Sequence, residues 1–213
     1  MSKYKTMKRL VTYITVGLLA FALGVAAHKA FGLTNVRDNQ TSAESREAEE
    51  YAVYSSIINS FRKGDRGNLL VIENVTSAFF PDGDKRSKRE YLREFTPPEV
   101  ADDTLDNYID VNAQPRQLGP LFTLKNPYVL ISKEESDSYF GDSPGLSERF
   151  SIKYPNSAEH ITRLSRVGFN SRMDEAVVHI RDTCGWDCGG GGFVQLTKEK
   201  GAWKINKARY AIF

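Results

Sequence analysis

Residues 175–212, with the sequence EAVVHIRDTCGWDCGGGGFVQLTKEKGAWKINKARYAI, decide the fold of this chain. They contain three apolar segments that predict β-strands, and a fourth such segment lies just upstream. Glu199-Lys-Gly201 predicts a tight turn between the last two strands. Sequential strands with short connections form an antiparallel meander. The four predicted strands are Ile161–Phe169, Glu175–Arg181, Phe193–Lys198 and Trp203–Ile212.

Helices are predicted upstream of this meander. Thr41-Ser-Ala-Glu44 is a capping box, in which the hydroxyl and the glutamate satisfy free helix donors reciprocally. Apolar side chains then recur at steps of three and four from Tyr51 to Phe61, which predicts an amphipathic helix. A second capping box, Ser87-x-x-Glu90, predicts a short helix that ends before Pro97. Proline suits the first turn of a helix, so Pro97-Pro98-Glu99 predicts the start of another helix, which runs to about Val111.

Two short apolar strands, Leu69–Ile72 and Tyr128–Ile131, are predicted between and after these helices, and residues 133–147 predict a long polar loop. The predicted class is therefore α+β, with N-terminal amphipathic helices packed on a C-terminal antiparallel β-meander. A length of 213 residues with 40% hydrophobic side chains suits one ordinary globular domain. We assign this domain to residues 41–213 and a polar linker to residues 28–40.

The N-terminal segment predicts export. Four cations and no acid precede residue 10, and residues 10–27 carry no charge and end in Val25-Ala26-Ala27. This pattern fits a secretory signal peptide cleaved after Ala27. The apolar run is long for a signal and short for a membrane span, so an uncleaved N-terminal anchor is the alternative. In either case the C-terminal domain is expected in the periplasm or bound to the inner membrane, with membrane contact only through residues 10–27.

The charge of the exported part argues against nucleic-acid binding. The whole chain has 29 Lys and Arg against 27 Asp and Glu. Removing residues 1–27 takes away four of these cations and no acid, which leaves 25 cations against 27 acids, a formal charge of −2. A nucleic-acid-binding domain needs a clustered basic face, and this composition offers no overall excess.

Several unusual stretches occur in an order that resembles an uncharacterised family of exported bacterial proteins. The resemblance implies a bacterial envelope protein, and it carries over no catalytic or binding residues because the family has no agreed mechanism. The stretches are Glu50-Tyr-Ala-Val-Tyr54, Phe150-x3-Tyr154-Pro155, Leu164-Ser-Arg-Val-Gly-Phe-Asn170, Cys184-Gly-x2-Cys188-Gly-Gly-Gly191 and Gly201-x-Trp203-Lys204.

Cys184 and Cys188 enclose three residues, and a close pair in an exported chain predicts a disulfide. A redox-active pair and a zinc site are weaker alternatives, because neither the usual spacing nor a second ligand pair is present. The ring would present Trp186 and Asp187, which we predict as binding residues. Gly189–Gly192 predicts a flexible or bulged connection into the next strand, because no helix follows to form a phosphate site.

Asp102, Asp106 and Asp110 recur every four residues, so one helix face would carry three carboxylates. Like charges at this spacing destabilise a helix slightly. Either the face is simply solvated, or the carboxylates bind a cation or a basic partner.

The function predicted from these features is a non-enzymatic binding or interaction module of the bacterial envelope, with an immunity or inhibitor protein as one subclass. Its partner is a protein or a small molecule, and no cofactor or metal is indicated. The alternative is an envelope hydrolase whose site is assembled by the fold. Its candidates are His179, Asp174, His160 and the loop that carries Trp186, because histidine is the usual general base near neutral pH. A tethered scaffold is a third possibility if residues 10–27 are retained.

Overall fold

The computed structural model describes residues 43–63, 68–139, 146–184 and 189–212. Residues 48–213 form one compact unit. A second unit, residues 1–47, is described only at residues 43–47, which are helical. The fold described below is that of the larger unit.

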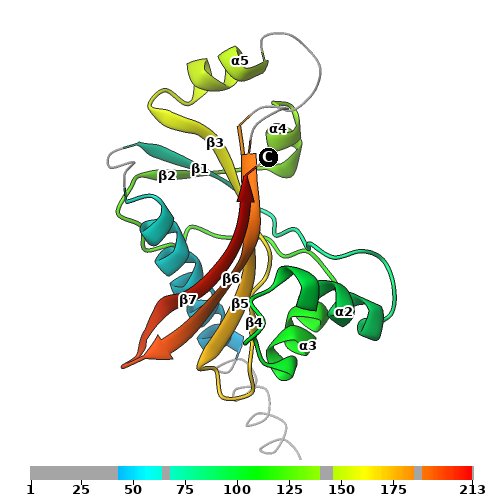
Figure 1. Cartoon of the computed structure of the whole chain (residues 1–213). Coiled ribbons are helices and arrows are strands. Elements are labelled where there is room, and N and C mark those ends of the chain that lie inside the picture. The colour runs from blue at the N-terminus through cyan, green and yellow to red at the C-terminus, as the bar shows by residue number, and fades with distance from the viewer. Residues whose placement is uncertain (1–42, 64–67, 140–145, 185–188, 213) are drawn as a thin grey trace, which may run out of the picture. The chain divides into compact units, whose positions relative to one another are not determined.

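A seven-stranded sheet forms the centre of this unit (Figure 1). Its order is β2-β1-β3-β5-β6-β7, and the short strand β4 also pairs with β5. The strands are β1 (Leu69–Glu73), β2 (Tyr128–Ile131), β3 (Ser157–Leu164), β4 (Gly168–Phe169), β5 (Glu175–Thr183), β6 (Gly189–Glu199) and β7 (Ala202–Ile212).

The α+β class is confirmed, and β3, β5, β6 and β7 pair in antiparallel order as predicted. The sheet as a whole is mixed, however, because β1 pairs in parallel with both β2 and β3. Parallel neighbours need long crossover connections, and here helices supply them. The single strand predicted over 161–169 is also wrong, because it is divided into β3 and β4.

The helices end close to their predicted limits, with three corrections. Residues 43–61 are helical, and α2 (Lys85–Phe95) and α3 (Asp102–Val111) follow β1. The predicted start at Pro97-Pro98-Glu99 is wrong, because α3 begins at Asp102 with Ala101 as its N-cap. The cap of α2 is Asp84, whose carboxylate accepts a hydrogen bond from Ser87 N, so Ser87 is not itself the cap. The predicted loop at 133–147 contains α4 (Lys133–Asp137), capped by Ser132, and the start of α5 (Leu146–Lys153).

One face of the sheet, called here the back face, shares the main core with the helix over residues 43–61. Tyr51, Tyr54, Ile57 and Ile58 pack there against residues of β1, β5 and β6. The Tyr54 hydroxyl donates a hydrogen bond to Ser165 O over 2.9 Å, which anchors the helix to the segment after β3. The apolar period of three and four therefore marks the buried side of this helix.

The opposite face, called the front face, is covered at two separate places (Figure 1). Helices α2 and α3 pack Leu92, Leu105 and Tyr108 against β5 and β6. Tyr139, Phe150 and Tyr154, from α4, α5 and their flanks, pack against β1 and β3. The ends of β5, β6 and β7 between these two coverings are the part of the sheet on which the candidate site is built.

Helix α3 is fixed to the sheet by a carboxylate from β5. Its N-cap residue, Ala101, has no capping side chain. Glu175 takes this role, because its Oε1 accepts hydrogen bonds from Ala101 N over 2.9 Å and from Thr104 Oγ1 over 2.5 Å. Gln195 in β6 donates to the other oxygen of the same carboxylate. A negative charge at a helix N-terminus is stabilising, so Glu175 orients α3, and through it α2, over the front face.

Candidate functional site

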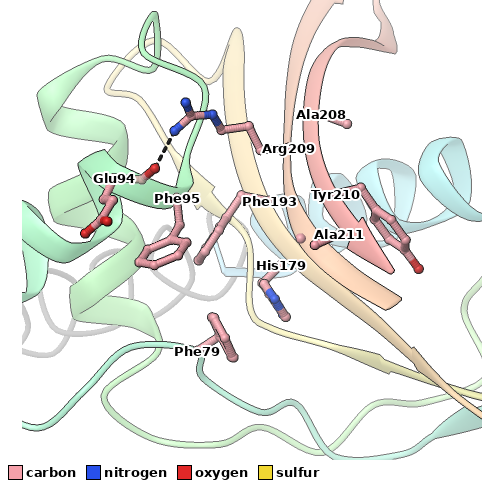
Figure 2. Close-up of a pocket in the computed structure, with 10 residues that line it drawn as sticks. Phe79, Glu94, Phe95, His179, Phe193, Ala208, Arg209, Tyr210 and Ala211 are labelled. Atoms are coloured by element: carbon pink, nitrogen blue, oxygen red, sulfur yellow. Dashed lines mark hydrogen bonds between the residues drawn. The ribbon is translucent and has the colours of Figure 1, made fainter. Parts of the chain in front are cut away.

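A pocket of about 470 Å³ opens on the front face beside the C-terminal end of α2 (Figure 2). His179 of β5 and Phe193 of β6 form its floor, and Phe79 and Phe95 form its aromatic walls. Phe79 and Phe95 are 38% and 40% exposed, which is unusual for phenylalanine side chains that meet around one cavity. The pocket is therefore apolar and open to solvent.

His179 is held between two aromatic rings. Its imidazole stacks on Phe79 with 4.2 Å between ring centroids and 6° between planes, and it meets Phe193 edge to face at 4.9 Å. Burial, together with the nearby charge of Arg181, lowers the pKa of His179 to about 4. The imidazole is therefore neutral at physiological pH. It supplies a flat surface with one hydrogen-bond donor and one acceptor, and it carries no charge.

Replacing His179 by Phe is expected to flatten the acid side of the stability profile. The folded chain takes up the His179 proton near pH 4, whereas the unfolded chain takes it up near pH 6.5. Acidification therefore favours the unfolded state between these values, by about 2 kcal/mol at pH 5. Urea unfolding at pH 7.5 and pH 5 should show this loss in the free energy of unfolding for the parent chain. The His179→Phe variant should not show it. Equal losses in both proteins would show that His179 is not the group responsible.

Arg209 of β7 holds the end of α2 in place at the pocket rim. Its guanidinium donates a hydrogen bond to the backbone oxygen of Glu94 (Figure 2). It donates a second one to Thr96 O over 3.3 Å. Phe95 lies between these two anchored residues in the sequence, so Arg209 fixes the position of this wall. The arginine thus acts on the pocket by positioning it.

The glycines at the start of β6 allow β7 to approach closely. A Cβ atom on Gly192 would lie 1.8 Å from Arg209 O, and one on Gly190 would lie 2.6 Å from the ring of Tyr210. Gly189–Gly192 pair along their whole length with β5, and Gly190–Gly192 pair with β7 as well. The prediction of a flexible connection at Gly189–Gly192 is therefore wrong, because these residues are regular strand whose missing side chains make room for the neighbouring strand.

A second pocket of about 380 Å³ lies on the other side of β7. Phe61, Arg62 and Asp182 line it together with Ala208 and Tyr210, which also line the first pocket. Tyr210 meets Phe61 edge to face at 5.8 Å and donates a hydrogen bond to Asp182 over 3.3 Å. Burial is the largest cause that raises the pKa of Tyr210, to about 12, so its hydroxyl stays protonated. The two pockets flank the same strand.

The three aspartates predicted as a binding face are paired within the chain. Helices α2 and α3 lie side by side and place a cation opposite each carboxylate, as Lys85–Asp110, Arg89–Asp106 and Arg93–Asp102. The Arg93 guanidinium holds the pKa of Asp102 below its usual range. The basic partner that would explain three like charges on one face is thus supplied by α2. A role for these aspartates in binding another molecule stays a prediction.

The predicted hairpin tip falls outside the described residues. Trp186, Asp187 and Cys188 all lie there, so their binding and pairing roles stay predictions. Cys184, which follows β5, is described, and no free cysteine occurs among the described residues.

The described candidates of the alternative hydrolase, His160, Asp174 and His179, do not come together, and the loop that carries Trp186 lies outside the described residues. His179 lies beside Ser165, because Ser165 N donates to His179 O and His179 N donates to Ser165 Oγ. Ser165 is five residues after His160, which places the two histidines about 16 Å apart along the sheet. Asp174 lies five residues before His179, just ahead of β5, and its carboxylate binds Asn170 and Arg172. In the described part of the chain, no carboxylate hydrogen-bonds to the His179 ring.

The described ranges contain no group of three or more His, Cys, Asp or Glu side chains placed to hold a metal ion. Within the same ranges, no helix is both long and apolar enough to cross a membrane, and the predicted segment 10–27 lies outside them. Comparisons with protein-family models, with curated proteins and with solved structures find no match to this chain. The resemblance to a family of exported proteins therefore stays a prediction.

Sequence reasoning missed most of the residues that form the front pocket. Phe79, Phe95 and Arg209 come from three segments that no local motif connects. The sequence signal for the pocket was the pair Phe79-Phe80 before a turn. This signal is weak, because adjacent aromatic residues are more often part of the core. His179 was singled out, but for acid–base chemistry that its surroundings do not support.

Proposed function

We propose that this chain is a non-enzymatic binding module of the bacterial envelope and that the front pocket is its ligand site. The observation that carries this proposal is a solvent-open pocket whose walls are half-exposed aromatic rings and whose only imidazole is uncharged. Apolar pockets with a few polar groups are the usual form of a ligand site. A catalytic site would instead need a nucleophile or a base with an orienting partner.

The pocket favours a flat, uncharged group on its ligand. Phe79 and His179 are already stacked, so a ligand ring could extend the stack or meet the edge of Phe95. Such a group could belong to a small molecule or to a side chain of a protein partner. A free anion would find little here, since Arg209 is engaged with backbone oxygens.

The cellular setting belongs to the same proposal. Its support is the basic and then apolar segment at residues 1–27, the cysteine pair and the resemblance to exported proteins. We further propose the arrangement of N-terminal amphipathic helices on the C-terminal antiparallel meander. Its support is the shared core of residues 51–58 with β5 and β6, and the hydrogen bond from Ser56 to Trp203 O.

Filling the pocket tests this function. Ala211 is exposed and lines the front pocket, so Ala211→Trp adds bulk there without removing a buried contact. The matched control is Ala202→Trp, an exposed position at the other end of β7. Indole, p-cresol and phenyl glucoside serve as probes in ligand-observed NMR, where fragments of this size bind with a Kd of about 1 mM.

At least one probe is expected to bind the parent chain and the Ala202→Trp variant alike, and to bind Ala211→Trp at least tenfold more weakly. Absence of binding by all three probes, or equal binding by the two variants, would overturn the assignment of the pocket.

A further inference from the structure

Within the part of the chain that the structure describes, strand β7 is a long sheet edge with no strand beyond it. The strand order places it at the end of the sheet, and among the described residues its backbone pairs with β6 alone. It has 11 residues, and residues 206–211 are all exposed, so contacts such as those of Arg209 with α2 and of Tyr210 with Phe61 cover this half only in part. An uncovered edge presents unpaired N–H and C=O groups and is a template for another strand.

The two pockets lie on opposite sides of this edge. The front pocket is lined by four consecutive residues of β7, Ala208–Ala211, and the pocket behind the sheet shares Ala208 and Tyr210 with it. Consecutive strand residues point to opposite faces, so a cavity lined by all four must include the edge itself. Side chains of an added strand would alternate in the same way and would meet the front and the back pocket in turn.

The charge of β7 selects the kind of strand that can be added. The strand carries Lys204, Lys207 and Arg209 and no acid. A second copy of β7 would place cations beside cations, which is unfavourable across strands. An acidic segment would place carboxylates there instead.

The present partners of the two lysines are weakly held. Lys204 pairs with Glu199 and Lys207 pairs with Glu99, and in each pair both side chains are about half exposed. Exposed ion pairs of this kind contribute little to stability. The lysines can therefore turn to an incoming carboxylate at small cost.

From these observations we propose that the partner of the front pocket is an extended, acidic peptide segment of another protein, which adds to β7 as a further strand. Apolar side chains at alternate positions enter the front pocket, the residue between them meets the back pocket, and flanking acids lie near Lys204 and Lys207. Strand addition of this type takes its affinity from the backbone and its specificity from pockets for alternate side chains. This inference rests on the proposed function, since it identifies the ligand of the same pocket.

The test uses the peptide acetyl-EEFVFEE-amide and its basic counterpart acetyl-KKFVFKK-amide with the isotope-labelled exported chain. The acidic peptide is expected to bind with a Kd of about 100 μM or below at low salt and to shift backbone amides of β7. The basic peptide should bind at least tenfold more weakly. Shifts confined to residues outside β7, or equal affinity of the two peptides, would overturn the proposal.

Two N-methylated forms of the acidic peptide separate strand pairing from simple adhesion. Alternate residues of a strand direct their N–H groups to opposite edges, so methyl groups on one alternate set block pairing with β7 and those on the other set do not. One form is expected to lose binding and the other to stay within about threefold of the parent peptide. Equal behaviour of the two forms would exclude strand addition.

The double variant Lys204→Gln with Lys207→Gln should bind the acidic peptide about fivefold more weakly at low salt. Its binding of the aromatic fragments should stay unchanged. Its matched control is Lys133→Gln with Lys153→Gln, two similarly exposed and ion-paired lysines of α4 and α5. If Ala211→Trp blocks the fragments while neither peptide reaches β7, the pocket function stands and strand addition fails. If the fragments also fail to bind, the proposed function itself is wrong.

Discussion

Replacing Glu50 by Ala is expected to lower the free energy of unfolding by about 3 kcal/mol, a large share of what a domain of this size possesses. The Glu50 carboxylate is 1% exposed and bridges two arginines, with Arg116 at 2.7 Å and Arg166 at 3.0 Å. Removing the acid leaves two partly buried cations facing each other without the carboxylate that bridges them. Breaking such a pair costs far more than an exposed one.

The position of Glu50 explains why the effect should be global. It lies in the helix over residues 43–61, whereas Arg166 lies between β3 and β4 and is itself held by Asn112 at the end of α3. The carboxylate therefore joins the helix behind the sheet to the segment that leads to the front-face helices. Loss of this link should loosen both sides of the sheet.

Urea unfolding monitored by circular dichroism measures this effect. Glu90→Ala is the matched control, because Glu90 also pairs with an arginine, Arg86, but in an exposed pair on one helix. Exposed pairs four residues apart contribute about 0.5 kcal/mol or less. Similar losses in the two variants would show that the Glu50 bridge is not the structural link described above.

Gly192→Ala is expected to separate β7 from β6 or to prevent folding. An added Cβ would lie 1.8 Å from Arg209 O and 2.7 Å from Tyr210 Cα, and both of these are backbone atoms of the neighbouring strand. A flexible side chain could move away, but a paired strand cannot without giving up its hydrogen bonds. We expect a loss of about 3 kcal/mol or more, comparable with severe overpacking in a core.

The matched control for this prediction is Gly191→Ala in the same strand. Its nearest atom would be Ile180 O at 3.1 Å, a contact that a shift of a few tenths of an ångström relieves. Gly191→Ala should therefore give a clearly higher soluble yield and a clearly higher thermal unfolding temperature than Gly192→Ala. The reverse order, or a Gly192→Ala variant as stable as the parent chain, would contradict the close approach of β7.

Local signals in the sequence predicted the elements well and their pairing less well. The strands β5, β6 and β7 and the helices α2 and α3 lie within a few residues of their predicted positions, because turns, caps and apolar periods are short-range features. The parallel addition of β1 and β2 was missed, since both contacts are made across long connections that leave no local pattern. The prediction for Gly189–Gly192 was wrong because the role of these glycines depends on how closely β7 approaches β6.

For the candidate site, too, the sequence identified some of the residues but not the surroundings that determine their roles. His179 and the aspartates of α3 were identified from residue type and spacing, yet their surroundings decide what they do. Burial and the charge of Arg181 keep His179 neutral, and the aspartates are occupied by cations of α2. Phe95 and Arg209 join the pocket only through contacts between α2 and β7, separated by more than a hundred residues. No reading of one segment could bring these residues together.

The ring protons of His179 provide the most direct test of the central claim, that the front pocket holds a ligand. The chain has three histidines, and the His179 signal is identified by its loss in His179→Phe. Titration of the chain with indole at pH 7 should shift the His179 resonance by ring-current effects and leave the other two in place, and Ala211→Trp should abolish the response. A His179 resonance that stays fixed while indole binds, or an unchanged response in Ala211→Trp, would show that the ligand site lies elsewhere.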